Sequence, residues 1–199
     1  MIDRRRLRSV VSRLAPLALL ASCGGAGAPV VDIAVIGDSR DAFDSGLRLS
    51  PAGQMVRAAT AEGLVSFDAE GRVVPALADR WIVNDDGLSY IFRMRDGLWA
   101  DGTQLTGESA RDALRQALAG LRGTSLGEDL SGIEEVRAMA GRVVEIRLSH
   151  PVPDLLDLLA QPELALMRKG KGSGAMTTRR DGNAQVLQPI RPEQRGLPR

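Results

Sequence analysis

The stretch Trp81–Thr106, which reads WIVNDDGLSYIFRMRDGLWADGTQLT, constrains the fold more than any other part of the chain. Three Asp-Gly pairs interrupt it, and this dipeptide tolerates the positive φ angles that tight turns require. Between the first two pairs, apolar and polar side chains alternate almost without error, which predicts a strand with one buried face. The expected inward side chains are those of Leu88, Tyr90, Phe92 and Met94. We expect Trp81 to join this core, because burying an aromatic side chain stabilises a fold by about 2 kcal/mol. Trp99 is expected in the core as well, the alternative being that it faces a cleft.

Regular elements are also predicted on both sides of this stretch. The β-branched run 30–36 predicts a buried strand. Ser50-Pro51 predicts a helix start, because serine caps helices and proline fits the first helical position. This helix is expected to end near Gly63 and to bury Met55, Val56 and Ala59. The remaining predictions are an ordered connection over 75–81, a helix after Thr106 with an apolar face at helical spacing, a hairpin over 133–148 and a short helix over 151–159.

The charge distribution excludes one class of partner. The chain has a formal net charge of +1, but residues 24–167 carry 13 basic and 22 acidic side chains, while residues 168–199 carry 8 and 2. Nucleic-acid binding depends on a positive surface that neutralises phosphates, so an acidic body of this kind predicts no nucleic-acid partner. The basic tail leaves binding to an anionic surface as an alternative. The 44% apolar content is that of a globular protein able to bury a core.

The N-terminal 22 residues have the three-part pattern of an export signal. A basic region, Arg4–Arg13, is followed by the apolar run Leu14–Ala21 and then by small residues. The apolar run is too short to span a bilayer as a helix. The tetrapeptide Leu20-Ala21-Ser22-Cys23 is similar to the bacterial lipobox, which implies a signal peptide over 1–22, an acylated Cys23 as lipid anchor and a flexible tether over 23–29. The alternative is a lone free thiol, since Cys23 is the only cysteine and has no disulfide partner.

Motifs for catalysis, metals and cofactors fail on inspection. His150 is the only histidine, so a histidine metal cluster is excluded, and its place before Pro151 favours a surface or turn role. The glycine-rich run Lys169–Gly174 lacks the lysine directly before Ser or Thr that a phosphate loop needs. The acidic pairs Asp85-Asp86 and Glu134-Glu135 lack the alternate spacing of a calcium loop. We therefore predict no catalytic residue, no metal site and no cofactor.

A long, ordered set of residues resembles one protein family. In chain order these residues are Glu62-Gly63-Leu64-Val65, Asp68, Gly71, Pro75-Ala76-Leu77-Ala78, Trp81, Asp86-Gly87, Tyr90, Phe92, Arg95-Asp96-Gly97, Trp99-Ala100-Asp101-Gly102-Thr103 and Leu105-Thr106. Together they are similar to the N-terminal signature of family 5 solute-binding proteins, the oligopeptide- and dipeptide-binding lipoproteins of bacterial ABC importers. Three positions depart from the pattern: Phe43-Asp44-Ser45 replaces Leu-Asp-Pro, Gly172-Ser173-Gly174-Ala175 replaces Gly-Thr-Gly-Pro, and Ser109 replaces an acidic residue in the helix cap.

The resemblance implies an α/β fold of the type II periplasmic-binding-protein class. Residues 30–60 would begin the first lobe, 61–167 would form its extra α+β subdomain, and 168–199 would return toward the first lobe. The second lobe would be missing. We further expect the chain to leave a sheet edge unpaired and the basic 168–199 segment poorly ordered.

The implied function is capture of a solute for import, not catalysis. The partners would be a peptide or other small solute, an ABC permease in the inner membrane, and the lipid membrane through Cys23, in the periplasm. The exposed backbone amides of the loop before the first helix favour a negatively charged ligand group. In relatives the corresponding loop borders the ligand, so we predict Leu49, Ser50 and Pro51 as ligand-binding residues; the alternative is a solvated connection. A second possibility is a truncated, non-binding, membrane-anchored lipoprotein of the same family. An enzyme built around Ser and His150 is a distant third.

Overall fold

The structure is a computed structural model that describes residues 31–38, 40–43 and 46–190. The chain divides into two units, residues 1–34 and 35–199. Of the first unit, residues 31–34 are described, and they form neither helix nor strand. The architecture below therefore belongs to the second unit.

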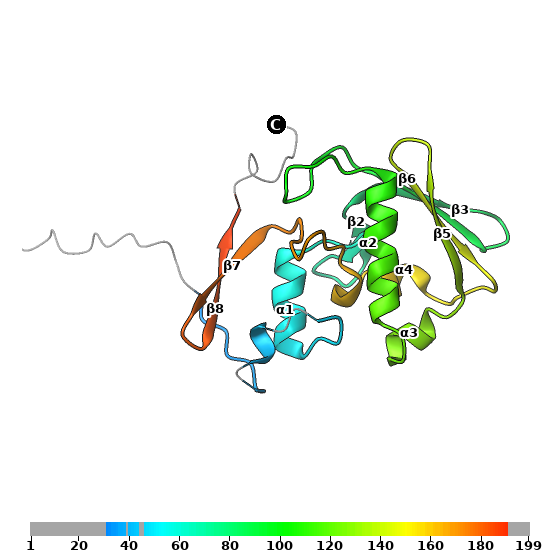
Figure 1. Cartoon of the computed structure of the whole chain (residues 1–199). Helices are drawn as coiled ribbons and strands as arrows, with labels where there is room; N and C mark the ends of the chain where they lie inside the picture. The colour runs from blue at the N-terminus through cyan, green and yellow to red at the C-terminus, as the bar shows by residue number, and fades with distance from the viewer. Residues whose placement is uncertain (1–30, 39, 44–45, 191–199) are drawn as a thin grey trace, which may run out of the picture. The chain divides into compact units, whose positions relative to one another are not determined.

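A four-stranded antiparallel sheet is the main β structure of this unit, with strand order β3-β4-β6-β5 (Figure 1). Its strands are β3 (Ala78–Val83), β4 (Ser89–Met94), β5 (Ile133–Met139) and β6 (Val143–Leu148). Gly87 and Gly141 turn the two hairpins with φ angles of 69° and 71°, which a residue without a Cβ adopts at little cost. The alternation predicted for β4 is confirmed over 91–94, whereas Ser89, expected to point outward, is buried, and Leu88 and Tyr90 are only half-buried. The hairpin predicted over 133–148 is confirmed.

One face of the sheet packs against α2 (Gly107–Gly120), which crosses it as the long green helix of Figure 1. Phe92 and Met94 are fully buried there, and Trp81 contributes a tilted ring contact with Phe92 at 6.4 Å between centroids. Trp99 is only 3% exposed, so its predicted place in the core is confirmed. The apolar face of α2 is also confirmed, and its buried members are Ala110, Ala113, Leu114 and Ala117.

The start of α2 is capped as the sequence predicts, despite the missing acidic residue. Thr106 Oγ1 accepts a hydrogen bond from Ser109 N at 3.2 Å, and Ser109 Oγ accepts one from Thr106 N at 3.0 Å, which completes a capping box. Ser109 Oγ also accepts a hydrogen bond from Trp99 Nε1 at 2.9 Å. The hydroxyl thus joins the helix start to the buried indole.

Helix α1 (Pro51–Thr60) begins where predicted, but its buried face differs. Ser50 caps it by accepting a hydrogen bond from Gly53 N at 3.2 Å. Its buried residues are Gly53 and Arg57, whereas Met55 is 45% exposed and Val56 and Ala59 are half-buried, so the expected buried face is wrong for Met55 and only partly met by the other two. The reason is close packing at Gly53, where a Cβ would lie 3.3 Å from both Asp41 O and Leu49 Cδ2. This contact turns the glycine face of the helix inward.

Short elements connect α1 to the sheet and complete the core. The strands β1 (Val65–Phe67) and β2 (Val73–Pro75) form a separate antiparallel pair, so the connection predicted over 75–81 is instead the end of β2 and the start of β3. The other short elements are the 3-10 helix η1 (Asp41–Phe43), α3 (Ser125–Asp129), α4 (Leu155–Leu159) and the 3-10 helix η2 (Pro162–Leu164). The α4 segment buries Leu155 and Leu159, so the short helix predicted over 151–159 is confirmed for 155–159, while residues 151–154 precede it without helical structure.

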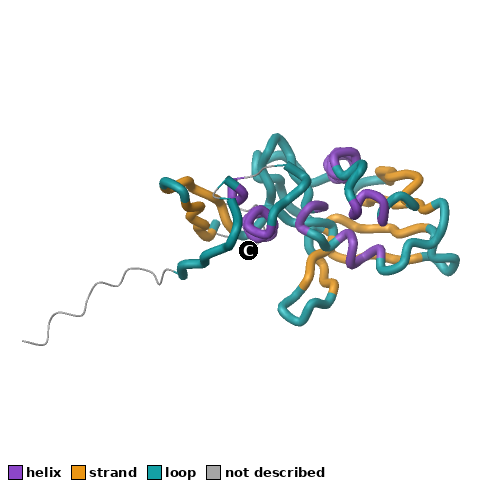
Figure 2. The backbone as a smooth tube through the Cα atoms, turned by 90° about the horizontal axis from the view of Figure 1, so that it is seen from below, coloured by secondary structure: helices purple, strands orange, loops and turns teal. Residues whose placement is uncertain are grey.

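The last described segment is a β-hairpin, β7 (Met176–Asp181) and β8 (Ala184–Pro189), in which β7 packs against α1 and β8 against η1 (Figures 1 and 2). The expectation of poor order is therefore wrong for residues 176–189. Each strand supplies the other's hydrogen-bonding partners across a turn at Gly182, whose φ is 58°. Residues 191–199 lie outside the described part of the chain.

The buried strand predicted over 30–36 is also wrong for its described residues, 31–36. They are in no strand, and exposed fractions reach 80% at Val31 and 102% at Ile36. A β-branched run favours extended backbone, but a strand exists only where a neighbouring strand completes its hydrogen bonds. Val30 lies outside the described residues.

Candidate functional site

The segment before α1 is held in place by two arginines. Arg57 is 4% exposed, and its Nη2 donates to Gly46 O at 2.8 Å. Arg48 Nη2 donates to Gly123 O at 3.4 Å, which links the segment to the turn between α2 and α3. Leu47 packs on Gly120, where a Cβ would lie 2.0 Å from Leu47 Cδ1. These contacts place residues 46–50 between α1 and the end of α2.

This arrangement forms a shallow, open hollow of about 530 Å³, which we call the loop hollow. Its lining residues are Leu47, Arg48, Leu49, Ser50, Leu121, Gly123, Thr124, Ser125, Leu126 and Glu163. Leu49 and Ser50 therefore border a concave surface, whereas Pro51 is exposed and is absent from the lining. The Ser50 hydroxyl oxygen caps α1 by accepting a hydrogen bond from Gly53 N, so this part of the side chain is already engaged.

Glu163 is a lining residue that sequence analysis did not single out. Its side chain comes from η2, and the residue is 8% exposed. Gln54 Nε2, from α1, donates to Glu163 Oε1 at 2.7 Å. The only sequence signal was an acidic residue directly after Pro162 within the apolar run 155–166, and burial could not be deduced from it.

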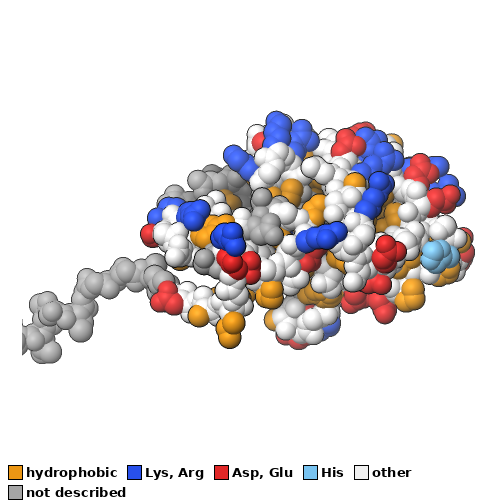
Figure 3. All heavy atoms as spheres, turned by 60° about the horizontal axis from the view of Figure 1, so that its bottom comes forward, with side chains coloured by type: hydrophobic (Ala, Val, Ile, Leu, Met, Phe, Trp, Pro, Cys, Tyr) orange, Lys and Arg blue, Asp and Glu red, His pale blue; other side chains and the backbone are white. Residues whose placement is uncertain are grey.

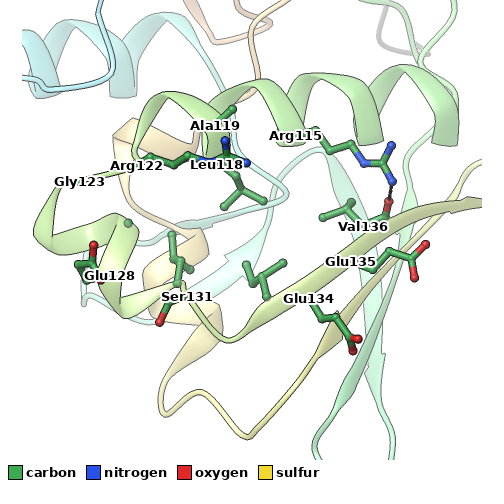
Figure 4. A pocket seen from close by; sticks show the side chains of 13 residues that line it. Arg115, Leu118, Ala119, Arg122, Gly123, Glu128, Ser131, Glu134, Glu135 and Val136 are labelled. Atoms are coloured by element: carbon green, nitrogen blue, oxygen red, sulfur yellow. Dashed lines mark hydrogen bonds between the residues drawn. The ribbon is translucent and has the colours of Figure 1, made fainter.

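A second hollow of about 660 Å³ lies where α2 and α3 meet β5, and we call it the β5 hollow (Figure 4). β5 is an edge strand of the sheet, and Arg115 from α2 donates to its Val136 O at 2.6 Å. The Glu135 carboxylate, which also borders this hollow, pairs with Arg137 at 2.7 Å, and this hydrogen-bonded guanidinium lowers the pKa of Glu135. Because Arg115 covers an edge carbonyl and Glu135 is already paired, the geometry favours protection of a sheet edge over ligand capture.

A third polar cluster surrounds Asp101, which is 13% exposed as a side chain. Hydrogen bonds from the Thr103 hydroxyl and backbone N–H, and after them the Lys169 ammonium, hold the pKa of Asp101 well below its usual range. Lys169 Nζ and Arg168 Nε lie 3.1 and 3.3 Å from Asp101 Oδ2. The cluster fastens the 101–103 turn to residues 168–169, so its role is structural.

Catalytic and metal chemistry find little support in the described residues. They contain no group of three or more His, Cys, Asp or Glu side chains placed to hold a metal ion. His150 is exposed, and its Nδ1 lies 3.1 Å from Ser149 Oγ, the side chain of the preceding residue. Within the described chain no carboxylate bonds the other ring nitrogen, so the pair lacks the third member of a triad.

The described surface carries charges of both signs (Figure 3). On the face shown in Figure 3, basic and acidic side chains are interspersed. Among the described residues, no helix has the length and apolar character needed to cross a bilayer. Cys23, the predicted lipid anchor, lies outside the described residues.

Comparison with solved structures shows the fold. NikA from Brucella suis, solved with Fe(III)-EDTA, matches with a TM-score of 0.63 and 21% identity over 74% of this chain and 33% of that one. OppA from Haemophilus influenzae, solved with the peptide RPPGFSPFR, matches with a TM-score of 0.62 and 20% identity over 70% and 34%. The chain thus has part of the type II periplasmic-binding-protein fold, as its sequence predicted.

Comparison with sequences gives the family. The probable deoxycholate-binding periplasmic protein YgiS of Escherichia coli K12 is 36% identical over 129 residues, 52% of this chain and 23% of that protein. The glutathione-binding protein GsiB of the same strain is 29% identical over 153 residues, 75% and 29% respectively. The chain therefore spans less than a third of the length of these relatives. The model of the bacterial extracellular solute-binding proteins, family 5 (middle region), matches residues 72–183. Because this match covers more than half of the residues of the chain, the chain belongs to the family 5 bacterial extracellular solute-binding proteins.

Proposed function

We propose that the chain is the solute-capturing component of an ABC importer, and that a peptide or similar small solute contacts the loop hollow. The observation that carries this proposal is the hollow itself, a concave surface lined by four leucines and by polar groups on the family's fold. Ligand sites are commonly of this kind. Leu49, Ser50 and Pro51 are the proposed contact residues, with Pro51 at the margin.

In the proposed domain organisation, the loop hollow is lined by residues of the first lobe and of the extra subdomain. Residues 61–167 form the extra subdomain, and residues 168–190 return to the first lobe, a scheme supported by the packing of β7 on α1. Solute-binding proteins of this fold class close two lobes around the ligand, so one lobe supplies only part of the contact surface. We therefore expect this chain alone to bind peptides weakly, since losing about 4 kcal/mol of contact weakens binding roughly a thousandfold.

The last part of the proposal is the attachment of the chain to a membrane. Cys23 carries the lipid, and the chain acts in the periplasm beside a permease of the inner membrane. The support is the lipobox-like Leu20-Ala21-Ser22-Cys23 together with one relative, YgiS, whose name describes a probable periplasmic binding protein.

An NMR titration tests the proposed site. Short peptides added to about 10 mM, a level suited to millimolar affinity, are expected to shift the amide signals of residues 47–50 and 123–126. Leu49→Trp should fill the hollow and abolish these shifts. Met55→Trp, a substitution of equal kind at an exposed position of α1, is the matched control and should leave them intact. If no peptide moves these amides, or if both variants behave like the parent chain, the loop hollow is not the ligand surface.

A further inference from the structure

Glu163 is a buried acid with little to balance it. The residue is 8% exposed, and its one hydrogen-bond donor among the described residues is the neutral amide of Gln54. Within the described chain, no Lys, Arg or His nitrogen lies within 4.0 Å of its carboxylate. A carboxylate removed from water is costly unless a cation or several hydrogen bonds compensate it. The Glu163 carboxylate borders the open loop hollow, so a positive group from outside the chain can reach it.

The loop hollow offers a route for such a group. Glu163 borders this hollow, whose other walls combine four apolar side chains, those of Leu47, Leu49, Leu121 and Leu126, with polar residues and a glycine. An aliphatic stem ending in a charged nitrogen suits this combination, because the stem covers apolar surface and the head reaches the carboxylate. Arg48, also in the lining, is exposed and donates to Gly123 O, so its guanidinium is directed to the α2–α3 turn.

The chemistry of the site selects an organic cation over a metal ion. Calcium takes six to eight oxygen ligands and magnesium six, whereas Glu163 is not part of any cluster of three or more His, Cys, Asp or Glu side chains in the described residues. An ammonium or guanidinium group is satisfied by one carboxylate and a few neutral acceptors. Ser50 Oγ and the carbonyls of the surrounding loop can serve as such acceptors.

We propose that Glu163 is a specificity residue that receives a cationic group of the captured solute, such as a lysine- or arginine-like side chain. The inference rests on the proposed function of the loop hollow and adds the ligand class to it. Without Glu163, the hollow would accept an apolar side chain and a cationic one nearly alike.

The test uses two blocked tripeptides, acetyl-Ala-Lys-Ala-amide and acetyl-Ala-norleucine-Ala-amide, which differ only in the terminal ammonium. Each is titrated into the full chain while the amides of residues 47–50 and 123–126 are followed by NMR. We expect the lysine peptide to bind at least about tenfold more tightly, the factor typical of a charge-assisted hydrogen bond. Glu163→Gln keeps the shape and the contact with Gln54, so it should remove this preference and leave the norleucine peptide unaffected.

A second charge-neutralising variant tests whether a lost preference for lysine comes from Glu163 itself or from the lower overall negative charge. Glu134→Gln removes an exposed carboxylate that lies in the β5 hollow, and the preference for lysine should survive it. Equal binding of the two peptides at the loop hollow of the parent chain would overturn the role of Glu163 and leave the proposed site standing. A preference that persists in Glu163→Gln would overturn it as well. If neither peptide shifts these amides, the proposed site fails and the inference fails with it.

Discussion

Arg95 and Glu62 form a two-pronged ion pair, with 3.1 Å from Nη1 to Oε1 and 2.7 Å from Nη2 to Oε2. Each side chain is 20% exposed, so water screens the pair only in part. Arg95 Nη1 also donates to Ala76 O at 3.1 Å. A single guanidinium thus joins the end of β4 to the segments that flank β1 and β2.

The ion pair leads to a prediction about stability. Arg95→Met keeps most of the aliphatic volume but removes both the pair and the bond to Ala76 O, so it should lower the free energy of unfolding by about 2 kcal/mol. Urea denaturation measures this change. Arg72→Met is the matched control, because Arg72 pairs with Asp68 and Glu70 while 72% exposed, and its loss should cost less than about 1 kcal/mol. Equal losses of unfolding free energy in the two variants would show that the contacts of Arg95 stabilise the fold no more than the exposed pairs of Arg72.

A second prediction concerns the crossing of residues 172–174 over the end of α1. A Cβ added at Gly174 would lie 2.4 Å from Thr60 C and 2.5 Å from Ala61 N, which are backbone atoms that cannot rotate away. Gly174→Ala should therefore destabilise the chain by roughly 1–3 kcal/mol. Gly170→Asn is the control, since nothing lies within 4 Å of that position and asparagine tolerates its φ of 73°. Thermal unfolding of both variants measures the change in stability. If Gly174→Ala leaves the unfolding temperature unchanged, the packing of residues 172–174 on the end of α1 is loose.

A third prediction follows from the lowered pKa of Asp101. Thr103 and Lys169 favour the ionised carboxylate in the folded chain, while the unfolded chain has the ordinary value near 3.8. The stabilisation is therefore present at neutral pH and is lost as the pH falls below about 4 toward the lower folded pKa. Asp101→Asn should reduce stability at pH 7 and flatten its dependence on pH between about 4 and 2.

Thr103→Val provides an independent check on Asp101. It removes the hydroxyl donor but keeps the backbone N–H, so it should weaken the acid dependence without abolishing it. Midpoints of thermal unfolding measured over this pH range give the comparison. A parent chain and Asp101→Asn variant that lose stability in parallel on acidification would contradict the assignment.

A fourth prediction tests the lipid anchor. The chain expressed in a bacterium should partition into the membrane fraction and incorporate labelled fatty acid at Cys23. Cys23→Ser should abolish the label, because the thiol is the acceptor of the lipid. Ser22→Ala is the control, since a small residue at that place keeps the lipobox-like pattern. Label that persists in Cys23→Ser would disprove the anchor.

The elements that could be predicted from sequence are those with a one-sided apolar pattern. Phe92 and Met94 in β4 and Ala113 and Leu114 in α2 repeat at the spacing of their element, and all four are buried as expected. The hairpin β7–β8 escaped prediction because its residues are mostly exposed on both faces, which leaves no periodic signal. The run 31–36 has strong strand propensity, yet propensity alone supplies no partner strand.

The site was predicted only where a local rule applied. Ser50-Pro51 marked a helix start, and this placed Leu49 and Ser50 at the border of the loop hollow. Glu163 could not be found in this way, because its burial results from η2 packing against α1 and α2 across a large sequence separation. Gln54 and Glu163 are 109 residues apart, and no pattern within either segment indicates their contact.

The different surroundings of the two tryptophans give the chain a built-in optical reporter. Trp99 is 3% exposed with its indole N–H bonded to Ser109, whereas Trp81 lies half-buried on the edge strand β3. Emission from a Trp81→Phe variant should therefore be blue-shifted and poorly quenched by iodide. Emission from a Trp99→Phe variant should be redder and more readily quenched. Fluorescence can thus follow the helix start and the sheet edge separately, without any attached dye.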